Sequence, residues 1–389
     1  MAFRFKLLYC PILWIILLLG QGNARAQFKE IAPGFDPKEC DELLRLNFVF
    51  QDTTGNTTFD NFQKGYTFVY RSPSLGLDNM WDLWTRADST VVILLRGTTS
   101  DMKSILADFY SVMMPAQGKI RLTKDKVFAY KLASSNRTAV HAGFLIGFAF
   151  LADDMKAKID SLYSAGYHKY LITGHSQGGA LAYYVSAWLH HQREDNIYPA
   201  IKVKTYASAS PKMGNMYFAY DYDNITREGW SYSIVNSDDA VPEMPFTTQQ
   251  VDIDMNEPNP ILGMMKRFDS LPFFKRIIIK GAFNKMIKNA ANSSKSYQKY
   301  LGRYLHDFVQ DALPELEMPE AVKTSYYSRP GVPISLLVND RYLERFKVNN
   351  GPYYHHGIIP YRFLLREYYD GLEPLQDDDI AYLLKGVYD

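Results

Sequence analysis

Strands and helices alternate along the middle of this chain, between about residues 90 and 240. The segments 91–95 and 170–173 are short and almost entirely apolar, as expected of strands that are covered on both faces. Longer segments with apolar residues at helical spacing follow them, over 144–162 and 180–190. This order predicts an α/β fold, with a mostly parallel central sheet covered by helices on both faces.

The character of the sequence changes over residues 246–330. Prolines and mixed polar residues come first, and 261–287 is rich in Met, Phe, Ile and Lys. A predicted strand over 332–337 and a predicted helix over 361–369 then resume the earlier pattern. We therefore expect one domain, residues 27–389, that carries a helical insertion at about 246–330.

The N-terminus has the pattern of a cleaved signal peptide, residues 1–26. Two basic residues precede an apolar run over 7–20, and 24–26 reads Ala-Arg-Ala, a typical cleavage site. The run is shorter than the ~20 residues that a membrane-spanning helix needs. The sequence therefore predicts export to the periplasm, the cell surface or the extracellular space.

The charge balance argues against nucleic-acid binding. The chain has 43 Lys and Arg against 42 Asp and Glu, with no block of like charge. Cleavage would remove Cys10 and leave only Cys40, whose acidic neighbours raise a thiol pKa, so we expect it to be unreactive. No partner protein is implied.

A Gly-x-Ser-x-Gly motif lies where a predicted strand passes into a predicted helix. Its residues are Gly174, His175, Ser176, Gln177 and Gly178. A serine on such a sharp turn is held out at the edge of a sheet, and the glycines let strand and helix approach closely. The context favours Ser176 as a nucleophile over an ordinary glycine loop.

A serine hydroxyl needs a base and an orienting acid, which in this kind of sheet follow it in the order acid, then histidine. Asp238 and Asp239 come directly after the predicted strand 232–235. Carboxylates at a strand end are equally often turn formers, so the pattern alone leaves both open.

Three histidines follow these aspartates. His306 lies inside a predicted helix, where a solvated side chain is expected. His355 and His356 lie in a loop before the final helix, where a catalytic base belongs, although exposed loop histidines also suit metals and surfaces. Two oxyanion donors complete the set: the N–H of Gln177, and Thr98, which follows the strand 91–95.

Several segments, taken in order, resemble the class 3 lipases, the fungal-type triacylglycerol lipases of the α/β-hydrolase fold. These segments are 95–100, 105–109, 140–144, 173–179, 206–215 and 235–242. The resemblance implies Ser176 as nucleophile and selects Asp239 as the orienting acid. It also implies an oxyanion hole formed by Thr98 and Gln177.

The resemblance implies His356 as the base and keeps His355 as the alternative. An aromatic residue usually follows the family's base by five positions, and Tyr361 stands in that relation to His356. Another form of the family has glycine two positions after the base, which fits His355 and Gly357.

The expected function is hydrolysis of carboxylic esters of lipids through a Ser-His-Asp triad and an acyl-enzyme, with no cofactor and no metal. The long stretch between Asp239 and His356, and the absence of the family's disulfides, leave the substrate less defined than the reaction. A phospholipase or short-chain carboxylesterase with the same triad is the alternative. A non-catalytic lipid-binding relative is the alternative from another class.

Apolar residues at two places bear on contact with lipid. In the resembling enzymes the segment corresponding to 101–114 is a mobile lid, and 261–265, 273–274 and 277–279 could form a second flap. Because apolar runs are most often buried, we expect these residues to be mainly core. An acyl-binding surface or a transient contact with a lipid interface is the alternative.

Overall fold

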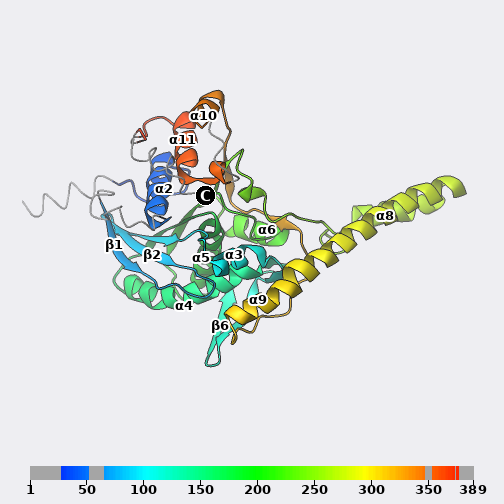
Figure 1. Ribbon diagram of the computed structural model, residues 1–389, viewed down its shortest axis with the longest axis horizontal. Coiled ribbons are helices and arrows are strands. Elements are labelled where there is room, and N and C mark those ends of the chain that lie inside the picture. Colours follow the sequence, from blue (N-terminus) through cyan, green and yellow to red (C-terminus); the bar gives the residue numbers. More distant parts are fainter. Residues whose placement is uncertain (1–27, 52–64, 347–352, 373, 376–389) are drawn as a thin grey trace, which may run out of the picture.

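A seven-stranded sheet forms the centre of the molecule (Figure 1). The computed structural model describes residues 28–51, 65–346, 353–372 and 374–375, so the predicted signal peptide lies outside the described residues. Four neighbouring pairs of strands are parallel, and the two pairs formed by the first three strands are antiparallel. In spatial order the strands are β1 (Tyr66–Arg71), β2 (Trp81–Arg86), β3 (Thr90–Leu95), β8 (Lys169–His175), β9 (Lys202–Ser208), β11 (Ser231–Asn236) and β13 (Val332–Leu336).

Helices cover both faces of this sheet. Successive side chains of β3 point to opposite faces, so Val91 and Ile93 join one core and Val92 and Leu94 join the other. The first core includes α4 (Ala142–Ser164) and α5 (Gln177–Glu194), and the second includes α2 (Pro37–Gln51) and α11 (Ile358–Tyr368). The predicted fold class is confirmed.

Two further groups of strands were not predicted. A four-stranded sheet contains strands of only two or three residues, which carry too few side chains for a periodic signal. A hairpin buries Ile120 and Leu122 on one face, an alternation that its polar residues obscure. These strands are β4 (Met113–Pro115), β7 (Ala139–His141), β10 (Gly214–Asn215) and β12 (Tyr327–Ser328) in the sheet, and β5 (Gln117–Thr123) and β6 (Lys126–Lys131) in the hairpin.

The segment predicted as an insertion is helical over residues 260–312. It contains α7 (Pro260–Arg267), α8 (Phe273–Gln298) and α9 (Tyr304–Ala312). Figure 1 shows α8 projecting away from the body of the molecule, whereas α9 packs against α3 (Met102–Phe109). No helix within the described ranges has both the length and the apolarity needed to cross a bilayer.

The expectation that the apolar residues near the two predicted flaps are mainly core is partly wrong. Tyr110, Val112, Met113 and Met114 are buried, but Phe109 at the end of α3 and four large residues of α8 are exposed. The exposed fractions of these four are 59% for Phe273, 79% for Phe274, 53% for Ile277 and 71% for Ile278. They lie on α8 where it has left the body, so the rest of the fold does not cover them.

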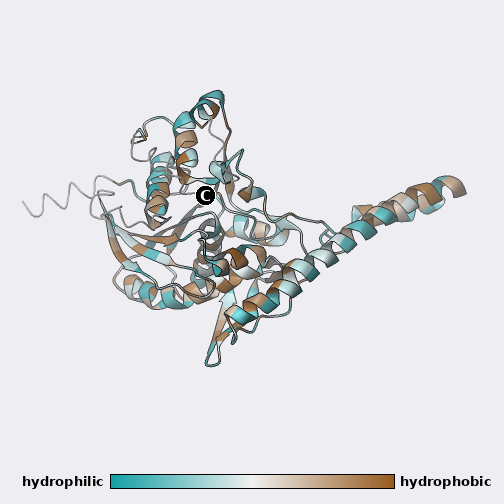
Figure 2. Ribbon diagram, in the orientation of Figure 1, coloured by the Kyte–Doolittle hydropathy of each residue, from teal (hydrophilic) through white to brown (hydrophobic). Residues whose placement is uncertain are grey.

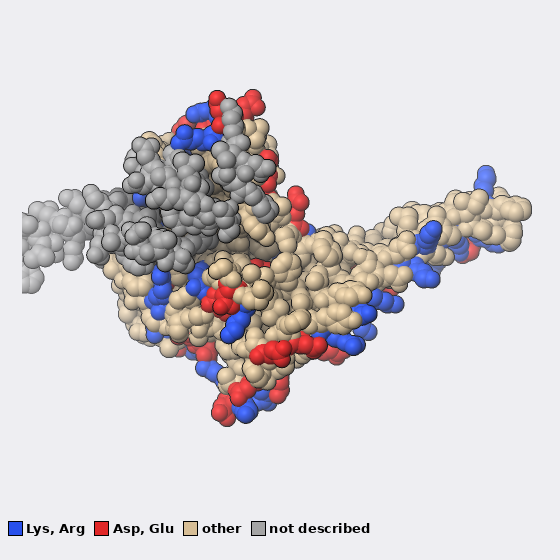
Figure 3. Space-filling model, in the orientation of Figure 1, with Lys and Arg blue, Asp and Glu red and all other residues tan. Residues whose placement is uncertain are grey.

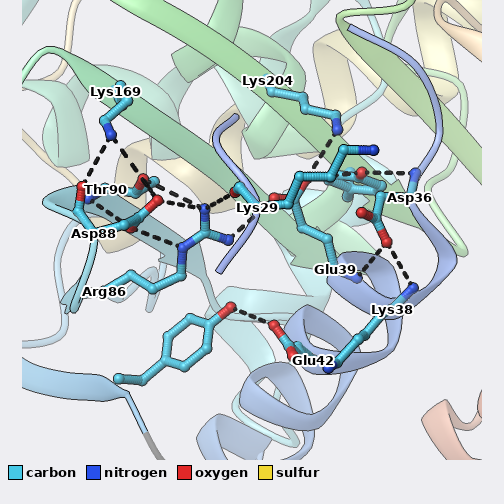
Figure 4. Close-up of polar contacts among 12 residues, drawn as sticks. Lys29, Asp36, Lys38, Glu39, Glu42, Arg86, Asp88, Thr90, Lys169 and Lys204 are labelled. Carbon is cyan, nitrogen blue, oxygen red and sulfur yellow. Dashed lines mark hydrogen bonds and ion pairs between the residues drawn. The ribbon is translucent and has the colours of Figure 1, made fainter. Parts of the chain in front are cut away.

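Buried ion pairs join α2 to two strands of the sheet, β2 and β9 (Figure 4). Arg86, at the end of β2, donates to Glu39 of α2 at 3.1 Å and to Asp88 at 2.9 Å. Lys204 of β9 binds the other oxygen of Glu39 at 2.9 Å. The Arg86 side chain is only 2% exposed, so removing it would leave two carboxylates in a dry environment with fewer donors.

Cys40 is buried beside this network in α2. Burial raises the pKa of its thiol, and the carboxylates of Asp41 and Glu39 raise it further. The thiol therefore stays protonated, which agrees with the prediction of an unreactive cysteine.

We expect Arg86→Ala to lower the free energy of unfolding by about 3–5 kcal/mol, because it leaves Glu39 and Asp88 uncompensated. Lys156→Ala is the matched control, since its pair with Asp160 is exposed and should contribute about 0.3–0.5 kcal/mol. Urea unfolding followed by circular dichroism measures both values. Equal losses in the two variants would contradict a stabilising role for the buried network.

Candidate active site

Ser176 occupies a strained turn between β8 and α5. Its φ and ψ are 59° and −129°, a backbone conformation that residues other than glycine rarely adopt. A Cβ on Gly174 would lie 2.1 Å from the carbonyl oxygen of Gly178, and one on Gly178 would lie 2.2 Å from that of Leu95. Only glycine therefore lets α5 begin so close to β8 and β3, with Ser176 half-buried at the turn.

Asp239 and His356 meet at the carboxyl end of the sheet. The Nδ1 atom of His356 lies 2.8 Å from Oδ2 of Asp239, although 117 residues separate them in the sequence. Tyr361 donates its hydroxyl to the same oxygen at 2.7 Å, and the N–H of Val241 donates to Oδ1 at 2.9 Å. Because the carboxylate accepts from Nδ1, the Nε2 atom of His356 is left to accept a proton.

Asp239 remains ionised in spite of its burial. Burial raises the pKa of this carboxyl group, but the hydrogen bonds from His356 and Tyr361 outweigh that effect and hold the pKa below its ordinary value. Asp238 differs, because it is exposed: its carboxylate accepts from the hydroxyl of the neighbouring Ser237, and its backbone N–H donates to the side chain of Asn236. The structure thus separates the two candidate acids.

The two candidate bases are also separated. The Nδ1 atom of His355 lies 2.7 Å from the hydroxyl of Tyr342, and its ring stacks on that of Tyr342. Asn236, the last residue of β11, donates to the backbone oxygen of His355 at 2.9 Å. Of the adjacent pair, the structure brings His356 to Asp239 and turns His355 away.

His175 connects the serine turn to the histidine loop. Its Nε2 atom donates to the backbone oxygen of His356 at 2.7 Å, so its Nδ1 atom is left to accept from the hydroxyl of Ser208 at 2.9 Å. Burial, together with the charge on His356, lowers the pKa of His175 to about 3, so the ring is neutral. Among the described residues no hydrogen bond joins Ser176 to the His356 ring, a contact that often tightens only when substrate binds.

Asp108 of α3 holds both residues of the candidate oxyanion hole. Thr98, in the loop after β3, donates its hydroxyl to Oδ2 at 2.9 Å, and the side chain of Gln177 donates to Oδ1 at 2.9 Å. Burial raises the pKa of Asp108 to about 6, and these two bonds oppose that rise. The N–H of Gln177, at the first position of α5, has no intrahelical acceptor and remains available.

Sequence reasoning missed the contacts of His175 and Asp108. His175 was predicted only as part of the turn, and Asp108 only as part of a matching segment. The sequence held no signal for either contact, since each depends on how distant elements meet. Within the part of the chain that the structure describes, no group of three or more His, Cys, Asp or Glu side chains could hold a metal ion.

His175 makes the stability of the fold depend on pH. An unfolded histidine binds a proton below a pH of about 6.5, whereas the native ring stays neutral down to a pH of about 3. Its contribution is therefore complete above about pH 6.5 and is lost as the pH falls, by about 2 kcal/mol between pH 7 and 5. Between pH 7 and pH 5 we expect the free energy of unfolding of His175→Gln to fall by about 2 kcal/mol less than that of the wild type. Urea unfolding of both proteins at the two pH values measures this. Equal losses in the wild type and the variant would contradict a neutral buried ring.

Comparisons with known proteins match the middle of the chain. Residues 92–249 match the family described as lipase (class 3). A secreted mono- and diacylglycerol lipase of Fusarium solani is 35% identical over 108 residues, which cover 27% of this chain and 29% of that protein. The lipase ZK262.3 of Caenorhabditis elegans is 34% identical over 88 residues, or 22% of this chain and 24% of that protein. The chain thus matches less than a third of the length of these curated relatives.

Solved structures of fungal lipases are also similar to parts of the chain. The Rhizomucor miehei lipase in complex with its propeptide has a TM-score of 0.43 and 21% identity, and the match covers 56% of this chain and 64% of that one. The lipase of Rhizopus microsporus has a TM-score of 0.40 and 23% identity, covering 56% of this chain and 72% of that one.

Proposed function

We propose that the protein is an exported serine hydrolase that cleaves carboxylic esters of lipids, a proposal supported by the match of residues 92–249 to the class 3 lipase family. The observation that carries the proposal is the pair of buried Asp239 and half-buried His356 at 2.8 Å, which His175 connects to the strained turn of Ser176. Export draws support from the name of the Fusarium relative, a secreted lipase. We also propose that residues 27–389 form one domain, because β13 and α11, which follow the helical segment, complete the same sheet and its cover.

The proposed reaction has two steps. In the first, Nε2 of His356 takes the proton of Ser176 while the hydroxyl oxygen of Ser176 attacks the ester carbonyl carbon. Asp239 stabilises the imidazolium that forms. The proton then passes to the leaving alcohol as the acyl-enzyme forms. In the second step His356 takes a proton from water, which attacks the acyl group, and Ser176 recovers its proton as the acid leaves.

The oxyanion of each tetrahedral intermediate would accept hydrogen bonds from Thr98 and from the N–H of Gln177. Donors of this type typically contribute about 2.7–4 kcal/mol each to the stability of the transition state. Asp108 fixes the side chains of both residues, so the donors are placed before substrate arrives. The chain's own residues would thus carry every step.

We expect Ser176→Ala to lower kcat for p-nitrophenyl esters by at least ~10³, because the variant lacks the attacking oxygen. Ser134→Ala, at an exposed position, is the matched control and should be unaffected. Assays with esters of increasing acyl length, and with a phospholipid, separate a lipase from a short-chain esterase and a phospholipase. Turnover that survives in Ser176→Ala would remove the mechanism, and no turnover of any ester by the wild type would favour a binding protein.

The two adjacent pairs of candidate residues provide internal controls. Asp239→Asn should lower kcat by about 10⁴, since a neutral amide would favour the wrong tautomer of His356, whereas the exposed Asp238→Asn should have little effect. His356→Gln should likewise abolish turnover, whereas His355→Gln should retain most of it. Steady-state kinetics on one soluble ester measures all four variants, and the reverse ranking within either pair would overturn the assignment.

A further inference from the structure

Residues 260–293 form a projecting arm, made of α7 and most of α8 (Figure 1). The 26 residues of α8 correspond to a length of about 39 Å at 1.5 Å per residue. The residues of α8 that are buried, Ser294 and Tyr297, lie near its end, and α7 buries none. Tyr297 fixes this root by donating to the hydroxyl of Ser111 at 2.6 Å, so the arm itself extends beyond the core.

One face of α8 is covered within the arm and the opposite face is open. The ring of Phe283 packs against that of Phe268, at 5.6 Å between centroids, and Lys280 pairs with Asp269 at 2.5 Å. Ile279 and Ile287 are half-buried on this same side of α8. The arm is therefore a two-helix unit with a thin internal contact and no core of its own.

The tip of the arm presents large apolar side chains to solvent. Phe273, Phe274, Ile277 and Ile278 are all more than half exposed, and their spacing places them together on the open side of the helix. Figure 2 shows the hydrophobic colour at this far end of the arm. An apolar patch of this kind on a soluble fold typically marks a surface that is covered by a partner.

The arm is also strongly basic. It holds seven of the chain's 43 basic residues and only one of its 42 acidic residues, Asp269, so its formal charge is +6 while the remaining chain carries −5. Figure 3 shows Lys and Arg side chains spread along the arm, whereas both signs mix on the visible body. The basic residues are Lys266, Arg267, Lys275, Arg276, Lys280, Lys285 and Lys288.

We propose that this arm binds the surface of an anionic lipid bilayer. The Phe and Ile side chains of the tip enter the headgroup region, and the surrounding Lys and Arg side chains lie at the level of the lipid phosphates. The apolar tip and the basic charge together favour an anionic bilayer over other partners. A nucleic acid would match the positive charge but would leave the apolar tip in water. A neutral apolar surface would in turn leave the +6 charge unmatched.

The root of the arm links the proposed lipid contact to the candidate active site. Tyr297 binds Ser111, which follows α3, and α3 carries the Asp108 that holds Thr98. Binding of the arm does not depend on the proposed esterase activity; only its use, to bring Ser176 to lipid substrate, rests on that proposal.

Vesicle flotation tests the proposal with the full chain in its Ser176→Ala form, so that no lipid is hydrolysed. The vesicles are pure phosphatidylcholine, or equal parts of phosphatidylcholine and phosphatidylglycerol. We expect the triple variant Lys275→Glu, Lys285→Glu and Lys288→Glu to lower the partition coefficient for the anionic vesicles by at least ~10-fold. The matched control reverses three exposed lysines of the body, Lys119→Glu, Lys202→Glu and Lys323→Glu, and should change the coefficient by less than about 3-fold.

A second variant, Phe274→Ser with Ile278→Ser, tests the apolar tip and should lose the part of the binding that survives in high salt. Because all these positions are exposed, thermal unfolding should show that the variants fold. Equal binding to both kinds of vesicle, or equal loss in the arm and body variants, would overturn the proposal. So would binding of the arm to a single-stranded oligonucleotide without binding to vesicles. Hydrolysis of p-nitrophenyl butyrate by the wild type is a separate readout, whose failure would remove the proposed function and leave the lipid-binding result standing.

Discussion

The close approach of α5 to the ends of β8 and β3 determines the geometry of the candidate site. With Gly174 and Gly178, the helix starts where any side chain would overlap a backbone carbonyl group. This approach accompanies the strained conformation of Ser176 and brings the first turn of α5 against Leu95 and Arg96, which directly precede the loop of Thr98. The strain is tolerated because α5 is buried along most of its length and cannot shift to relieve it.

Two ionisable groups around this turn differ in charge, because their hydrogen-bond partners differ. Asp239 is ionised because three donors reach it: the N–H of Val241, the ring of His356 in the 3₁₀ helix Tyr354–His356, and the hydroxyl of Tyr361 in α11. His175 is neutral because its partners, a backbone carbonyl and a serine hydroxyl, are satisfied by a neutral ring. A fixed charge thus stands on one side of His356 and a neutral ring on the other.

The sheet, its covering helices and most of the candidate site could be predicted from the sequence. Strands that are buried on both faces carry an apolar signal that does not depend on their partners, and the glycines around Ser176 have a local steric cause. The choice between His355 and His356 could not be made from position alone, because adjacent residues in a 3₁₀ turn point in different directions. Asp108 was equally hidden, since its contacts depend on α3 folding back over the loop after β3.

The arm could not be predicted for a different reason. The hydropathy of a side chain indicates that its burial is favourable, but it does not identify the surface that covers it. Phe274 and Ile278 therefore cannot be distinguished from core residues in the sequence. An overall charge near zero likewise conceals a basic arm on a body of opposite sign. In water the arm buries little of its own apolar surface, and its helices gain only a thin mutual contact. An anionic bilayer would supply both the missing burial and the missing counter-charge, which makes the exposed tip consistent with a stable fold.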